Sequence, residues 1–291
     1  MRKFTKLILA MAVPVAVLAG GNANAGTMIT DWNYENLFGF SAYAPAGVPP
    51  GGVEALNANT ATNFSIGSLN ANPAINDPTK LSWGSATARS SFVLSGNTGN
   101  FGQTLGSVQT NLGDAFDLKL THNNFPIPLE ATTLQSATLV GSLMLQSTLP
   151  VTLSGIPIGP LTGHFKILFK ETTNNPSSHH CADGAPEQCP DIFVLDAANS
   201  SPLTNVFLAT IDNWNYFLSV NVSGLQNVGP EACASVVPAQ GPGCLGFETK
   251  ENQTTDLVLS FNITAVPEPG TLALLGLGLA GLGFGRNRRR N

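Results

Sequence analysis

The sequence predicts an all-β fold, an antiparallel and jelly-roll-like β-sandwich, followed by a single membrane-spanning helix near the C-terminus. Three observations lead to this prediction. Short runs alternate between apolar and polar side chains, which is typical of half-buried strands. Clusters of Gly, Asn, Ser and Pro separate the runs, and long amphipathic helical patterns are absent between them. A charge-free apolar run occupies residues 271–285.

The clearest strands combine period-two alternation with many β-branched or aromatic residues. They are expected at 116–120, 164–170, 216–222 and 257–263. Shorter candidates lie at 91–94, 138–145, 191–195 and 206–211. Eight or more short strands joined by loops favour a two-sheet sandwich, which we place at residues 26–265.

The N-terminal residues 1–25 have the pattern of a secretory signal peptide. Arg2, Lys3 and Lys6 precede an apolar stretch, and small residues end it at Ala23-Asn24-Ala25. We expect the secretion machinery to export the chain and signal peptidase to cut before Gly26. The alternative is an N-terminal anchor that is never cut.

The C-terminal residues 266–291 have three parts in a fixed order. Pro267-Glu268-Pro269 comes first, the apolar run 271–285 follows, and a basic cluster ends the segment at Arg286, Arg288, Arg289 and Arg290. A helix over the apolar run is roughly 22 Å long, so it spans a bilayer core of about 30 Å only with local thinning or snorkelling of Arg286. Because basic flanks stay cytoplasmic, the rest of the protein is expected on the far side.

This three-part ending resembles the PEP-CTERM sorting signal. The resemblance implies recognition and cutting by an exosortase, a membrane-embedded cysteine protease. It also implies an inner-membrane-anchored intermediate that is then released to the cell surface or the extracellular space. Proteins with this signal tend to occur in bacteria that make exopolysaccharide, so exopolysaccharide is a possible partner in a biofilm. The alternative is a plain C-terminal anchor.

The segment between the two signals is acidic. It contains six basic and 17 acidic residues, a net charge of −11, because the other seven basic residues and Glu268 belong to the terminal segments. This charge opposes binding to nucleic acid and to anionic membranes.

Four cysteines, Cys181, Cys189, Cys233 and Cys244, lie in this exported segment. An even number in an oxidising compartment indicates disulfides, with three possible connectivities. Short loops favour Cys181–Cys189 and Cys233–Cys244. A metal site that includes His179 and His180 is the alternative, although the spacing fits no common zinc pattern.

The middle of the chain resembles the choice-of-anchor K type of surface domain, over about residues 80–265. A Trp-Gly segment, a Thr-His-x-Asn-x-Pro-Ile segment and a Glu-Thr-x-Asn-like segment occur in that order. The residues of the first two are Trp83, Gly84, Thr121, His122, Asn124, Pro126 and Ile127, and Lys170-Glu171-Thr172 and Pro190-Asp191 follow downstream. The resemblance implies a surface protein, and it provides no established catalytic activity to carry over to this chain.

Common catalytic and nucleotide-binding signatures are missing from the sequence. His122 is expected to fix a turn by bonding backbone groups, with contact to a ligand or metal, or catalysis, as alternatives. No cofactor is expected, although Asp114 and Asp117 leave a calcium site open.

The leading hypothesis is therefore a non-enzymatic surface or extracellular-matrix protein. A carbohydrate-binding module is the second hypothesis, with Trp32, Trp83 and Trp214 as sugar platforms if they are not core residues. A hydrolase with an unrecognised site is the third.

Overall fold

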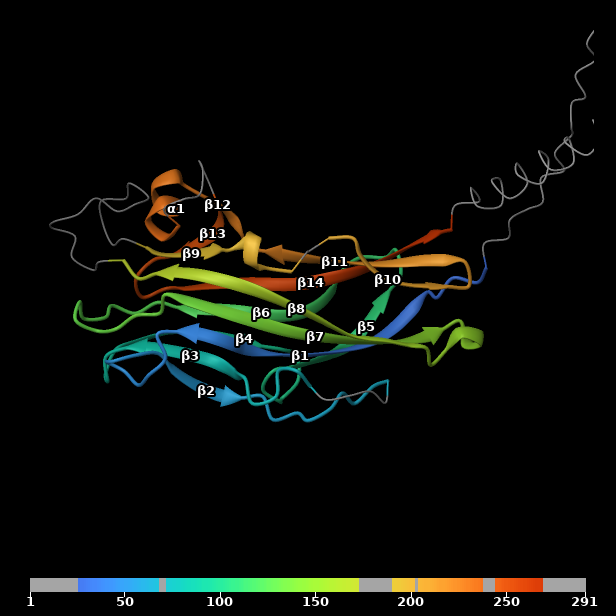
Figure 1. The fold of residues 1–291 in the computed structure, drawn as a ribbon, viewed down its shortest axis with the longest axis horizontal. Helices are drawn as coiled ribbons and strands as arrows, with labels where there is room; N and C mark the ends of the chain where they lie inside the picture. Colours follow the sequence, from blue (N-terminus) through green and yellow to red (C-terminus); the bar gives the residue numbers. More distant parts are fainter. Residues whose placement is uncertain (1–25, 68–71, 173–189, 202–203, 238–243, 269–291) are drawn as a thin grey trace, which may run out of the picture.

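The computed structural model describes residues 26–67, 72–172, 190–201, 204–237 and 244–268, and these form two antiparallel sheets of seven strands each (Figure 1). The first sheet has the order β12 (Gln226–Val228), β13 (Cys244–Thr249), β9 (Asp191–Leu195), β8 (Pro157–Lys170), β7 (Ser136–Leu149), β1 (Asp31–Ala44) and β5 (Gln103–Gln109). The second has the order β10 (Val206–Ile211), β11 (Trp214–Ser223), β14 (Thr254–Pro267), β6 (Ala115–Asn123), β4 (Arg89–Ser95), β3 (Pro78–Gly84) and β2 (Glu54–Ala58). The predicted all-β fold is confirmed.

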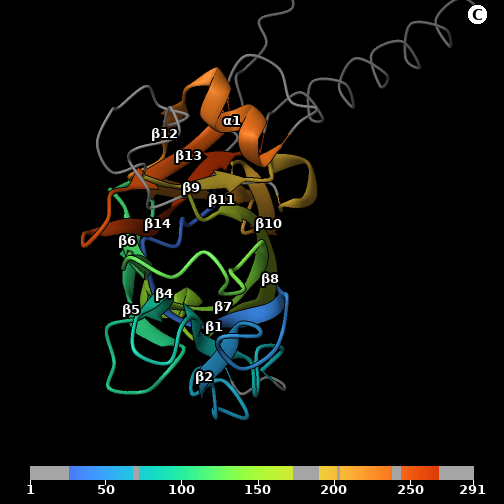
Figure 2. The same ribbon diagram turned by 90° about the vertical axis from the view of Figure 1, so that its left-hand side faces the viewer.

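The apolar core lies between the two sheets, which face each other when the molecule is viewed along its long axis (Figure 2). One part of the core joins Phe40 of β1 and Ile167 of β8 to Leu120 of β6. The other part joins Trp32 of β1 to Tyr216 of β11. Alternate residues of β14 are buried, as the period-two pattern predicts.

The strand order departs from that of an eight-stranded jelly roll. Strands β7, β8 and β9 are neighbours within one sheet, and β2, β3 and β4 are neighbours within the other. Consecutive strands lie side by side there, so parts of each sheet are meanders.

Both described ends of the domain meet at the turn between β10 and β11, which we call the β10–β11 end. The backbone N–H of Thr27 donates to Asp212 Oδ2 at 2.5 Å, and that of Glu268 donates to the Asn213 carbonyl at 2.8 Å. The opposite end of the long axis carries the β13–β14 turn and the short helix α1 (Pro230–Val236). We call it the α1 end.

A disulfide joins Cys233 of α1 to Cys244 of β13, so this predicted pairing is confirmed. The helix was not expected from the sequence. Pro230 starts it, and Ala232 and Cys233 pack into a small apolar cluster with Ile192 and Val194 of β9. Cys181 and Cys189 lie outside the described residues.

Several predicted features of the two termini also lie outside the described residues. They are the signal peptide 1–25, Pro269, the apolar run 271–285 and the arginines Arg286, Arg288, Arg289 and Arg290. Among the residues that are described, no helix has the length and apolar character needed to cross a bilayer.

Candidate functional site

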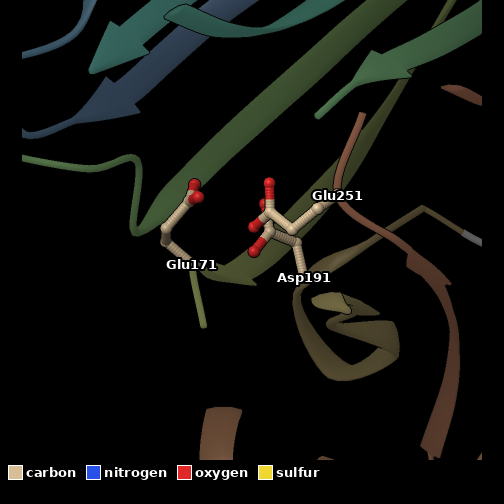
Figure 3. Close-up of side chains that lie close together, drawn as sticks. All are labelled: Glu171, Asp191 and Glu251. Carbon is tan, nitrogen blue, oxygen red and sulfur yellow. The ribbon is translucent and has the colours of Figure 1, made fainter. Parts of the chain in front are cut away.

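Three carboxyl side chains meet at the α1 end. Glu171 directly follows β8, Asp191 opens β9, and Glu251 lies in the turn between β13 and β14. Because β8, β9 and β13 are neighbours in one sheet, residues far apart in the sequence come together where these strands end or begin. One oxygen from each carboxyl group lies within 4.8 Å of the others, and Figure 3 shows the three groups close together. We call this set the acidic cluster.

The acidic cluster is buried and receives few hydrogen bonds. Asp191 and Glu251 are only 0% and 5% exposed, and Glu171 is half-buried. The Trp83 indole N–H donates to Glu171 Oε2 at 2.9 Å, and the Thr172 backbone N–H donates to Asp191 Oδ1 at 2.9 Å. Within the described part of the chain, Glu171 Oε1, Asp191 Oδ2 and both oxygens of Glu251 accept no hydrogen bond.

Burial favours the protonated form of all three groups, and repulsion within the cluster adds to this effect at Glu171 and Asp191. Burial is the main cause that raises the pKa of Glu171 to about 7 and of Glu251 to about 7, and it raises the pKa of Asp191 well above its usual range. The Glu171 charge adds to the rise at Asp191, and a proton on Asp191 gives it a hydrogen bond to Glu171. Chemically, the cluster therefore either shares protons or holds a cation.

His122 is buried beside the acidic cluster. It is 0% exposed, its ring stacks on Trp83 with centroids 5.8 Å apart, and its Nε2 lies 3.8 Å from Asp191 Oδ2. That distance is too long for a hydrogen bond. Burial lowers the pKa of His122 to about 3, so the imidazole is neutral and does not balance the carboxylates.

His122 was expected to fix a turn through hydrogen bonds to backbone groups, and this expectation is wrong. Neither ring nitrogen has a hydrogen-bond partner among the described residues, so the imidazole does not bond backbone groups there. It packs instead against the rings of Phe92 and Phe169. Strand alternation explains this, because β6 turns His122 into the core and Thr121 outward, where Thr121 Oγ1 donates to Asp256.

The Trp-Gly segment and the Thr-His-x-Asn-x-Pro-Ile segment of the family resemblance lie next to each other around Trp83 and His122. A Cβ atom at Gly84, which has φ +114°, would lie 2.7 Å from Ile127 Cγ2, so these two residues are in close contact. The Asn124 side-chain amide donates to the Thr249 carbonyl at 2.9 Å. Pro126 is exposed on the connecting loop. The loop after β6 is thus fastened to β3 and β13, on either side of Trp83 and His122.

Sequence reasoning missed the acidic cluster. Glu171 and Asp191 lay in segments that were noticed only for their family pattern. Glu251 follows Lys250 and precedes Asn252 in a polar turn, where a charge ordinarily indicates a solvated surface. The sequence carries no signal that would have joined the three.

The fold does not bring Asp114 and Asp117 together, so they do not form the calcium site that the sequence left open. Asp114 is exposed and accepts hydrogen bonds from Asn221 and Asn262 at 2.7 and 2.9 Å. Asp117 accepts one from Asn36 of the other sheet at 2.5 Å. The two carboxyl groups therefore serve separate structural contacts.

The final strand leads into the C-terminal segment. β14 ends at Pro267, and Glu268 bonds to the β10–β11 turn, while Pro269 and the arginines lie beyond the described residues. A family profile described as the PEP-CTERM protein-sorting motif matches residues 265–290. The chain carries a PEP-CTERM sorting motif. No curated protein matches the chain.

The sorting motif identifies how the chain is handled. It marks an exported protein that is processed by exosortase, first as a membrane-anchored intermediate and then at the surface. The match lies outside the acidic cluster, so the folded domain has to be interpreted from its own residues.

Proposed function

We propose that the protein is a non-enzymatic structural component of the cell surface or extracellular matrix, associated with exopolysaccharide in a biofilm. One observation carries this proposal. Both ends of the sandwich contact the β10–β11 turn, next to the sorting motif. During sorting, this end faces the membrane and the α1 end projects away from it.

The junction between strand and motif supports release of an intact domain. Val266 and Pro267 pair with Asn215 and Trp214 of β11, so the backbone there is extended, as the prolines predict. It is also part of the sheet, because β14 ends at Pro267. A cut after Pro267 therefore leaves every described strand in place.

The burial of the site supports a structural role for the domain. General acid–base or nucleophilic catalysis requires a side chain within hydrogen-bond reach of a substrate. His122 is enclosed by aromatic rings, and Asp191 and Glu251 are almost inaccessible. Trp32 and Trp83 are each 0% exposed, so neither forms the sugar platform of the carbohydrate-binding hypothesis.

The test of sorting is the mass of the protein purified from its native host. We expect a chain that begins at Gly26 and lacks the terminal arginines. In a strain without exosortase, the tail should remain and the protein should stay in the inner membrane. Replacing residues 267–269 with alanines should have the same effect. Wild-type protein that still carries Arg286–Asn291 would show an ordinary anchor instead.

The test of the matrix role compares biofilms of the wild type and of a strain lacking this protein. We expect the matrix of the deletion strain to retain less exopolysaccharide, and a copy with intact residues 267–269 to restore it. A copy with alanines there should not. An unchanged matrix in the deletion strain would contradict this role. The non-enzymatic assignment has its own test, a screen for hydrolase activity. Turnover by the wild type that is lost in His122→Ala would contradict that assignment.

A further inference from the structure

We propose that Glu171, Asp191 and Glu251 bind a calcium ion that fastens β8, β9 and the β13–β14 turn together at the α1 end. This inference is independent of the proposed matrix role. It assigns a ligand to the acidic cluster from the cluster's geometry, its charge balance and its access to solvent.

The geometry fits an oxygen-coordinating ion. One oxygen from each of the three carboxyl groups lies within 4.8 Å of the others. Ca²⁺ takes oxygen ligands at about 2.3–2.6 Å, so three oxygens that lie within 4.8 Å of one another can share one ion.

The free donor atoms are all oxygens. Glu171 Oε1, Asp191 Oδ2 and both Glu251 oxygens lack hydrogen-bond partners within the described chain. Thr249 Oγ1 is a further buried oxygen without a hydrogen-bond partner there, and Thr249 is paired directly with Asp191 across β13 and β9. Carboxylate and hydroxyl oxygens are ligands that suit a hard cation.

The charge balance also indicates a missing cation. Three carboxyl groups share a site in which no described Lys or Arg forms an ion pair with them. The His122 ring is also aimed at the cluster, with Nε2 3.8 Å from Asp191 Oδ2, and it is buried without a hydrogen-bond partner among the described residues. A calcium ion gives the carboxylates a positive partner.

A cavity borders the acidic cluster at Glu171. A cavity of about 260 Å³ is lined by Glu171, Thr172 and residues of the loop 127–133. Glu171 is the most exposed member of the acidic cluster, so an ion that enters the cavity meets this carboxylate first. Extracellular calcium modules bind with dissociation constants of about 10⁻⁴–10⁻³ M, and an exported protein works in that setting.

The test is thermal unfolding of the full-length chain in detergent, in excess EDTA and in 10 mM CaCl₂, MgCl₂ or MnCl₂. We expect Ca²⁺ to raise Tm by about 5 °C over EDTA. The shift should disappear in Glu251→Gln, which keeps the side-chain volume and loses no hydrogen bond to the described residues. It should persist in Asp114→Asn, which removes an exposed carboxylate away from the cluster.

Terbium provides a second readout that does not depend on stability. Tb³⁺ replaces Ca²⁺ at oxygen sites, and Trp83 beside Glu171 should sensitise its luminescence. Emission should be competed away by Ca²⁺ and lost in Glu251→Gln. Absence of any Ca²⁺ effect in the wild type, or an equal effect in Glu251→Gln, would show a proton-sharing cluster and overturn the proposal. A response to Mg²⁺ or Mn²⁺ without one to Ca²⁺ would overturn the assignment to calcium.

Discussion

Glu35 of β1 and the acidic cluster are both buried, but only Glu35 is fully hydrogen-bonded. Its Oε2 accepts from the backbone and side chain of Ser65 and from the backbone of Ile66, at 2.5, 2.7 and 3.3 Å. Its Oε1 accepts from the Gln103 amide at 2.7 Å. In the acidic cluster, four carboxyl oxygens accept no hydrogen bond from the described residues.

The contrast separates two ways of burying a carboxylate. A charge surrounded by N–H and O–H donors is stabilised by the protein itself, so Glu35 is complete without a ligand. A cluster that lacks donors depends on protons or on a cation from solution. Donor supply, rather than burial alone, therefore indicates which carboxyl groups are available to a ligand.

The largest effect is expected where the donors are most numerous. Glu35→Ala leaves the donors of Ser65, Ile66 and Gln103 without their acceptor, so it should lower the free energy of unfolding by about 4 kcal/mol. Urea unfolding measures this. Glu54→Ala is the matched control, because its ion pair with Arg89 is partly exposed and contributes about 0.5 kcal/mol. Equal losses in the two variants would remove the basis of the comparison.

The next effect tests what holds the acidic cluster in place. Replacing Cys233 and Cys244 together with serine opens a disulfide of sequence separation 11, so stability should fall by about 2–3 kcal/mol. The sheet, rather than this disulfide, positions Glu171, Asp191 and Glu251. Calcium affinity measured by titration calorimetry should therefore change less than threefold. A loss of binding would show that α1 shapes the site.

Asp117 is an intermediate case, with one amide donor and a cavity of about 200 Å³ beside it. Burial raises its pKa to about 7. Between pH 4 and pH 7 the native state keeps this proton while the unfolded state releases it, so the stability contribution present below pH 4 is lost as pH rises. We expect a loss of about 2 kcal/mol, roughly half the full linkage value because the cavity admits water. Asp117→Asn should remove this pH dependence in urea titrations, and an unchanged slope would contradict the assignment.

The smallest effect concerns the donor that Trp83 gives to the acidic cluster. Trp83→Phe removes the N–H that bonds to Glu171, and Trp32→Phe removes one that bonds to the neutral Thr110 hydroxyl at the same distance, 2.9 Å. Because hydrogen bonds to charged acceptors are stronger, Trp83→Phe should cost about 1 kcal/mol more in calcium than Trp32→Phe. Equal costs would show that Glu171 is protonated.

Much of the fold could be predicted because its strands alternate. The runs at 116–120, 164–170, 216–222 and 257–263 lie in β6, β8, β11 and β14. β1 was not predicted, since both of its faces are buried and the polar residues Glu35 and Asn36 interrupt the apolar pattern. The strand order depends on contacts between distant segments, which periodicity does not encode.

The candidate site was predicted only in fragments for the same reason. His122 stood out in its local motif, yet its neighbours Asp191 and Glu251 are far away in the sequence and are placed by the order β8, β9, β13. The sorting motif was fully visible because it is a local pattern of composition and order. The short disulfide loop between Cys233 and Cys244 was visible for a similar reason.

The position of β14 has a mechanical consequence. This strand is paired with β11 on one side and β6 on the other, and it leads directly into the tail. While the protein is tethered, a pull on the tail acts along the strand axis, across the hydrogen bonds on both sides. The load is then shared by many bonds in shear instead of opening them one at a time. The domain is attached to its tether through a strand that resists extraction under drag.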